Sequence, residues 1–161
     1  MKKVVLVLTL VFASFVSFSQ QKEDSIKNDV FYTSFKSGAG EKIPVNFKFA
    51  NDFLEKLQKS EVYLLWQKQI LSDPKNVDTP AVEMYLKICT WSASFYAKLG
   101  LKNSASYTPI ANSEGFIYIN DKGEVNFSFP YKAQNGYGNM LISTAYYTEK
   151  IKNGKIINTH F

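Results

Sequence analysis

The most regular hydrophobic pattern in the chain is an alternation over residues 125–134. Every second side chain there is apolar, and those between are polar or proline; the apolar set is Val125, Phe127, Phe129, Tyr131 and Ala133. Such alternation predicts a strand with one face toward a core. The preceding Asn-Asp-Lys-Gly, at 120–123, suits a type I turn closed by a left-handed glycine. The resulting hairpin pairs Ile117 with Phe127.

A second hairpin is predicted at the C-terminal end. Asn153-Gly154 is the strongest short hairpin signal, and it separates a strand candidate over 140–152 from another over 155–161. A two-residue turn at this point pairs Tyr147 with His160.

Two further strands are predicted near the N-terminus. Residues 30–35 are rich in β-formers, and residues 42–49 alternate in part. The flexible segment 37–40 joins them. Residues 20–28 are polar and are predicted to be a loose leader.

Helical periodicity fills the region between these strands. Residues 51–71 are predicted to be helical, with Asn51 or Asp52 as the candidate cap. Ser60-Glu61 interrupts the apolar stripe, so the pattern is compatible with one helix or with two. The stripe consists of Phe53, Leu57, Leu64 and Leu71, with Leu54 and Leu65 beside it.

A second helix is predicted from Pro80 to Leu99. Thr79-Pro80 is a strong start signal, and Gly100 follows the last apolar position. The apolar stripe of this helix consists of Val82, Leu86, Cys89, Ala93, Tyr96 and Leu99. A polar loop is predicted for 101–114.

This order of elements predicts an α+β fold. A helical hairpin packs on one face of an antiparallel sheet of about four C-terminal strands, with one or two extra N-terminal strands. In outline the order is similar to that of cystatin-like and NTF2-like domains, which place a helix on a curved sheet; a shared fold would not by itself give a function. Residues 20–161 are expected to form a single domain.

The first nineteen residues have the pattern of a secretory signal peptide. A cationic start is followed by an apolar run, and Ser17 and Ser19 are small residues at the positions that signal peptidase reads. The run is shorter than the roughly 20 residues of a membrane span. The sequence therefore predicts export, periplasmic or extracellular, with no membrane anchor after cleavage.

Composition excludes several chemistries. The chain has 19 basic residues beside its histidine, and all of them are lysines. Arginine is the usual bidentate ligand of phosphate and guanine, so its absence argues against nucleic-acid binding. The formal net charge is only +5, and part of it lies in the predicted signal peptide.

The residues that usually carry metal or nucleophilic chemistry are scarce. Cys89 is the only cysteine and His160 the only histidine, so no zinc site, other metal site or cofactor is expected. Cys89 falls on a predicted apolar stripe and is expected to be a buried core residue. The carboxylates are scattered without a spacing that forces a pair, so no catalytic residue is assigned.

The candidate binding surface follows from strand parity. Phe116 and Tyr118 point away from the apolar face that contains Ile117, and Tyr147 and His160 are candidates to extend that second face. The competing interpretation is that the N-terminal strands cover these side chains. Trp66 and Trp91 lie on the predicted helices and are expected to be packing residues.

The composition favours a small exported binding protein without catalysis of its own, for an unknown protein or glycan partner. One alternative is a carboxylate-dependent hydrolase of envelope or extracellular polymers. Another is an inhibitor or immunity protein that blocks a partner enzyme. An open second face of the sheet would favour binding.

Export yields the first testable prediction. We expect cleavage after Ser19, because Ser17 and Ser19 meet the small-residue requirement. The intact mass of the exported protein should match a chain that begins at Gln20. An exported chain that retains Met1 would contradict the prediction.

Overall fold

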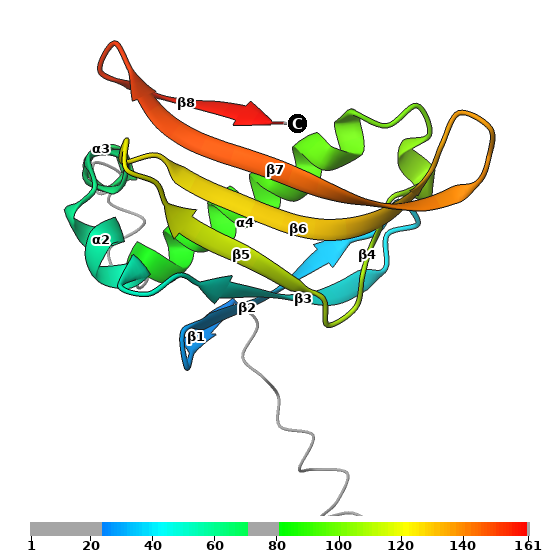
Figure 1. The fold of residues 1–161 in the computed structure, drawn as a ribbon, viewed down its shortest axis with the longest axis horizontal. Coiled ribbons are helices and arrows are strands. Elements are labelled where there is room, and N and C mark those ends of the chain that lie inside the picture. Colours follow the sequence, from blue (N-terminus) through cyan, green and yellow to red (C-terminus); the bar gives the residue numbers. More distant parts are fainter. Residues whose placement is uncertain (1–23, 71–80, 161) are drawn as a thin grey trace, which may run out of the picture.

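The strands of the protein form one curved and mostly antiparallel sheet in the computed structural model, which describes residues 24–70 and 81–160 (Figure 1). The order across the sheet is β1-β2-β3-β5-β6-β7-β8, and the short β4 pairs with β6. The eight strands are β1 (Ser25–Lys27), β2 (Val30–Lys36), β3 (Lys42–Phe49), β4 (Thr108–Pro109), β5 (Glu114–Ile119), β6 (Val125–Gln134), β7 (Met140–Lys152) and β8 (Lys155–His160). The predicted signal peptide and the Thr79-Pro80 helix start lie outside the described residues.

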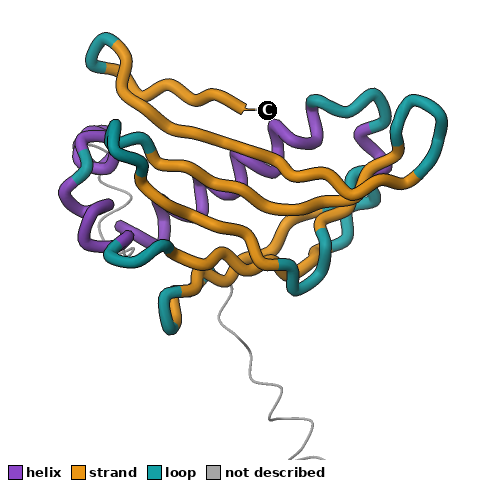
Figure 2. The backbone as a smooth tube through the Cα atoms, in the orientation of Figure 1, coloured by secondary structure: helices purple, strands orange, loops and turns teal. Residues whose placement is uncertain are grey.

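The helices lie on one side of this sheet and at one of its ends. They are α2 (Phe53–Lys59), α3 (Glu61–Ile70) and α4 (Ala81–Leu99). Figure 2 shows α4 crossing the sheet alone, with α2 and α3 gathered at one end. The class is α+β as predicted, but the predicted helical hairpin on the sheet is only roughly matched. None of the described helices is both long and apolar enough to span a membrane.

Both predicted C-terminal hairpins are confirmed. Ile117 pairs with Phe127, and Gly123 closes the first turn with φ 74°. Tyr147 pairs with His160 across the second turn, where Asn153 and Gly154 both have positive φ. Local turn chemistry and side-chain alternation therefore set the register of this half of the sheet.

The N-terminal part of the sheet is more extensive than predicted. Ser25–Lys27, expected to belong to a loose leader, form β1 and pair with β2. Asn28 and Asp29 make the tight turn between them with φ values of 51° and 59°. These two residue types tolerate the left-handed conformation, which a two-residue hairpin requires.

A parallel pairing of β3 with β5 joins the two parts of the sheet, and Phe47 lies opposite Gly115. A β-carbon at Gly115 would lie 2.7 Å from the Phe47 ring and 2.7 Å from the Ser128 carbonyl oxygen. Real β-carbons do not approach other atoms so closely. Only glycine therefore fits at this point of β5.

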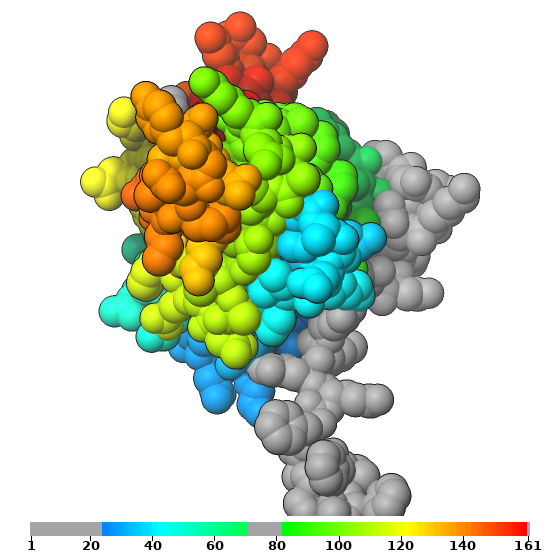
Figure 3. Space-filling view, turned by 90° about the vertical axis from the view of Figure 1, so that its right-hand side faces the viewer, coloured from blue at the N-terminus to red at the C-terminus, as the bar shows by residue number. Residues whose placement is uncertain are grey.

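The segment after α4 is not the simple polar loop that the sequence predicted. It contains a 3-10 turn, η2 (Ser104–Ser106), and β4, and Tyr107 is fully buried. The Tyr107 carbonyl accepts a hydrogen bond from the Gly38 backbone N–H at 2.6 Å. In Figure 3 this green segment lies between the cyan β2–β3 turn and the orange β6–β7 hairpin, so it closes this end of the domain.

The break in the first helical segment occurs at Ser60, which gives two helices. The Ser60 hydroxyl accepts a hydrogen bond from the Tyr63 N–H at 3.2 Å and donates to the Leu57 carbonyl at 2.8 Å. This bridging hydroxyl caps α3 while it closes α2. Asp52 occupies the cap position of α2, but its side chain makes no capping hydrogen bond.

The core lies between α4 and the face of the sheet that carries the apolar strand residues. Cys89 is buried there, as expected. Three helix predictions were wrong: Leu64, Leu99 and Trp91 are exposed, whereas Val62, Tyr63 and Trp66 fill the contact from α3. After the break at Ser60, α3 presents a different face from the one that a continuous helix would present.

Phe127 should be a main anchor of this core. It is 1% exposed and packs edge-to-face on Tyr147 at 5.9 Å. Phe127→Ala should lower the free energy of unfolding by about 3–5 kcal/mol in urea denaturation. Phe116→Ala removes the same ring from the exposed face and should cost far less. Similar losses for the two variants would contradict this assignment of faces.

Candidate functional site

The predicted second face of the sheet is open at its centre in the described part of the chain. Phe116 is 51% exposed and Tyr118 is 43% exposed, and no described element covers them. Ser128 and Tyr146 continue the row from Phe116, and Asn126 lies beside Tyr118. Exposed aromatic rings thus stand among hydroxyl and amide groups. We call Phe116, Tyr118 and Tyr146 the sheet-face patch.

The other two predicted surface residues lie on the opposite side of the sheet. Tyr147 pairs with Phe127 and is buried in the core, because odd-numbered residues of β7 face α4. His160 stacks on Tyr96 of α4, with ring centroids 4.2 Å apart. Neither residue extends the sheet-face patch, and Tyr146 takes that position instead.

A buried polar cluster connects α4 to β7. The Glu149 carboxylate accepts hydrogen bonds from the hydroxyl groups of Tyr85 and Tyr147, each at 2.9 Å. Burial, followed by the negative charge of Glu149, raises the pKa of Tyr147; burial, followed by the neighbouring Cys89 and Glu149, raises that of Tyr85 well above its usual value. Burial also raises the pKa of the Cys89 thiol well above its usual value. These phenols and the thiol therefore stay protonated, and the thiol is a poor nucleophile.

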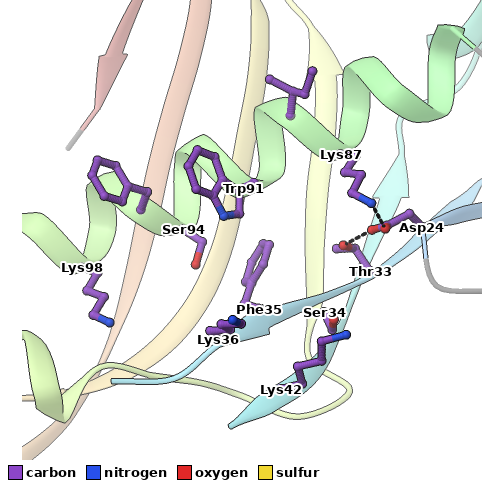
Figure 4. Close-up of a pocket in the computed structure, with 12 residues that line it drawn as sticks. Asp24, Thr33, Ser34, Phe35, Lys36, Lys42, Lys87, Trp91, Ser94 and Lys98 are labelled. Carbon is purple, nitrogen blue, oxygen red and sulfur yellow. Dashed lines mark hydrogen bonds and ion pairs between the residues drawn. The ribbon is translucent and has the colours of Figure 1, made fainter. Parts of the chain in front are cut away.

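A groove of about 510 Å³ lies between α4 and β2 on the other side of the helix. Its α4 wall includes Ile88, Trp91 and Phe95, and its β2 wall includes Phe35 and Lys36. Figure 4 shows Trp91 directed from α4 toward Phe35 and Lys36. We call this cavity the α4–β2 groove.

Two stacked aromatic rings dominate the helix wall of the groove. Trp91 and Phe95 lie 5.8 Å apart with an interplanar angle of 14°, and they are 66% and 46% exposed. They occupy positions i and i+4, so they lie on one stripe of the helix. Large rings left open to water on a helix are a frequent mark of an interaction site.

The rim of the groove is cationic. Lys36, Lys42, Lys87 and Lys98 line it, against Asp24 as the single carboxylate. Asp24 is already engaged, because it pairs with Lys87 at 2.7 Å and accepts a hydrogen bond from Thr33 at 2.7 Å. Lys36 and Lys98 carry no ion pair within the part of the chain that the structure describes. The groove therefore combines apolar walls with positive charge.

The α4–β2 groove was not predicted from the sequence, although the sequence of α4 contains a signal for it. Lys87, Trp91, Phe95 and Lys98 recur at helical spacing on a stripe that is distinct from the buried one. A helix with two apolar stripes has more apolar surface than one sheet face covers. Treating Trp91 as a packing residue concealed that excess.

In the described residues, no three carboxylate, thiol or imidazole side chains come together to form a candidate metal site. Comparisons with protein-family models, with curated proteins and with solved structures gave no match for this chain.

The buried phenols predict a loss of stability at alkaline pH. In the unfolded chain a tyrosine ionises near pH 10, whereas Tyr85 and Tyr147 stay protonated in the fold. The unfolded state therefore binds fewer protons above about pH 10, and the free energy of unfolding falls there by up to about 1.4 kcal/mol per pH unit for each such phenol.

Urea denaturation at pH 8 and pH 11, followed by circular dichroism, measures this loss. Tyr85→Phe should flatten the alkaline decline, whereas Tyr137→Phe, at an exposed loop position, should leave it unchanged. Equal stability of the unsubstituted protein at the two pH values would show that the phenols are not held protonated.

Proposed function

We propose that this is a small, exported, non-catalytic binding protein whose ligand combines apolar groups with negative charge and occupies the α4–β2 groove. The observation that carries the proposal is the exposed Trp91–Phe95 stack under a lysine rim. Aromatic side chains dominate binding energy at many interfaces. Lysines at the rim would attract an anionic ligand and orient it.

The position of the chemically reactive groups favours binding over hydrolysis. Glu149 is buried, and its two oxygens accept hydrogen bonds from tyrosines, away from the groove lining. Asp24, at the rim, is held by Lys87 and Thr33. A carboxylate-dependent hydrolase needs two carboxylates on either side of the scissile bond. The groove lining offers one, and that one is engaged.

The sheet-face patch is the second candidate binding site. The exposure of Phe116 and Tyr118 favours it, and so do the neighbouring Asn126 and Ser128, which could hydrogen-bond a protein or glycan partner. The sheet-face patch is less favoured than the groove because a flat surface buries less of a small ligand than a groove does. An inhibitor or immunity role would also use an exposed surface of this kind, but no residue selects it.

The groove proposal predicts binding of a small amphipathic anion. Anilinonaphthalene sulfonate has an apolar ring system and one negative charge, so we expect it to bind the purified protein with increased dye fluorescence. Trp91→Ala combined with Phe95→Ala should weaken this binding about tenfold or more, equivalent to about 1.4 kcal/mol. Lys98→Glu alone should also weaken dye binding, and this loss should be larger at low salt than at high salt.

The matched control removes two exposed rings elsewhere. Phe116→Ser combined with Tyr118→Ser should leave dye binding nearly unchanged, and thermal unfolding should confirm that both double variants fold. If the sheet-face variant loses binding while the groove variant keeps it, the site is the sheet-face patch. If both variants bind as the unsubstituted protein does, neither site holds this class of ligand.

A further inference from the structure

In the described part of the chain, the β2 wall of the α4–β2 groove is a strand edge without a pairing strand. Strand β1 pairs with β2 only over Val30–Tyr32, whereas β3 pairs with it over Val30–Lys36. From Thr33 to Lys36 β3 is the only described strand that pairs with β2. These four residues span about 13 Å of extended chain.

The hydrogen-bond pattern shows which backbone groups face outward along this edge. The Phe49 N–H donates to the Asp29 carbonyl at 3.0 Å, and the Ser37 N–H donates to the Glu41 carbonyl at 2.9 Å. In an antiparallel pair, residues alternate between bonding the partner strand and pointing away from it. Odd-numbered residues of β2 therefore bond β3, and Ser34 and Lys36 direct their N–H and C=O groups away from it.

Pro44 supports the same assignment. It lies opposite Ser34 in the β2–β3 register and has no N–H to donate. A pair that contains proline cannot exchange two backbone hydrogen bonds, so Ser34 belongs to the outward set. Unpaired strand edges are templates for another strand, and proteins usually cover or blunt them.

The groove has the length and the charge for an added strand. The α4 wall from Lys87 to Lys98 is about 16 Å long at 1.5 Å per residue, which matches about five extended residues. A strand laid against Ser34 would direct alternate side chains toward the Trp91–Phe95 stack. The remaining side chains would lie on the face that carries Lys36. Apolar groups suit the first set, and acidic groups suit the second.

We infer that the groove binds an extended, acidic peptide segment, which adds as a strand to the open edge of β2 beside α4. The inference rests on the proposed function and names the class of ligand. Main-chain hydrogen bonds from Ser34 and Lys36 supply affinity, and the rings and lysines supply specificity. An antiparallel orientation places the acidic residues opposite Ser34 and Lys36, with their own N–H groups toward β2.

The test uses blocked hexapeptides in which leucine alternates with glutamate, titrated into the purified protein by calorimetry. Replacing every glutamate by lysine should abolish binding. N-methylation of the glutamates should also abolish it, whereas N-methylation of the leucines should be tolerated, because only one set of N–H groups faces β2. The opposite selectivity would support strand addition in the parallel orientation. Equal tolerance of both methylated peptides would overturn the inference.

A matched pair of protein variants tests the edge itself. Ser34→Pro removes one outward N–H at a position where an edge strand tolerates proline, whereas Ser34→Ala removes the same hydroxyl and keeps the N–H. We expect Ser34→Pro to weaken peptide binding at least about tenfold and Ser34→Ala to leave it unchanged, with circular dichroism showing that both fold. Equal binding by the two variants would contradict strand addition.

Two further outcomes separate this inference from the proposed function. If anilinonaphthalene sulfonate binds in the groove but no peptide does, the groove binds apolar anions and strand addition is wrong. If neither probe binds, both proposals fail. Sedimentation velocity tests whether a second copy of this chain occupies the edge. A dimer that is lost in Ser34→Pro would assign the edge to that copy and overturn the inference.

Discussion

The close approach of β3 and β5 is the constraint on which the rest of the structure depends. This parallel pairing links the N-terminal strands to the C-terminal meander, and it needs glycine at 115 because the Phe47 ring and the Ser128 carbonyl occupy the space of a side chain. A parallel connection cannot be a tight turn. The chain between β3 and β5 therefore has room for α2, α3 and α4, and α4 returns across the sheet. The β2 edge and the groove beside it follow from that path.

One helix must then serve two surfaces. The inner stripe of α4 buries Leu86, Cys89 and Ala93 against the sheet, and Tyr85 reaches Glu149 of β7. The outer stripe carries Trp91 and Phe95, and no strand in the described part of the sheet covers these two rings. β1 begins at Ser25 and pairs with β2 only as far as Tyr32, so within the described residues no strand pairs with this edge beside the two rings. The groove is therefore a consequence of how far the sheet extends past α4.

Sequence predicted the C-terminal half of the fold well because its signals are local. The turns at 120–123 and 153–154 fix the register within a few residues, and parity assigned Phe116 and Tyr118 correctly to the open face. Tyr147 was wrongly offered as an extension of that face, because its side follows from the β6–β7 pairing, which places it opposite Phe127 and was not predicted from the sequence. The groove, the β3–β5 pairing and the burial of Tyr107 depend on contacts between distant segments. No pattern within one element encodes such contacts, although the second stripe of α4 and the Asn28-Asp29 turn left readable traces.

The bond between Tyr85 and Glu149 joins residues 64 positions apart, and β3 meets β5 across a similar distance in the chain. The entropy of closing such long loops is lost before the contacts form, so folds of this kind assemble slowly compared with helical bundles. During that interval the alternating faces of β6 and β7 and the edge of β2 are open to other chains. The interval before β3 reaches β5 is therefore the stage of folding at which aggregation competes with formation of the domain.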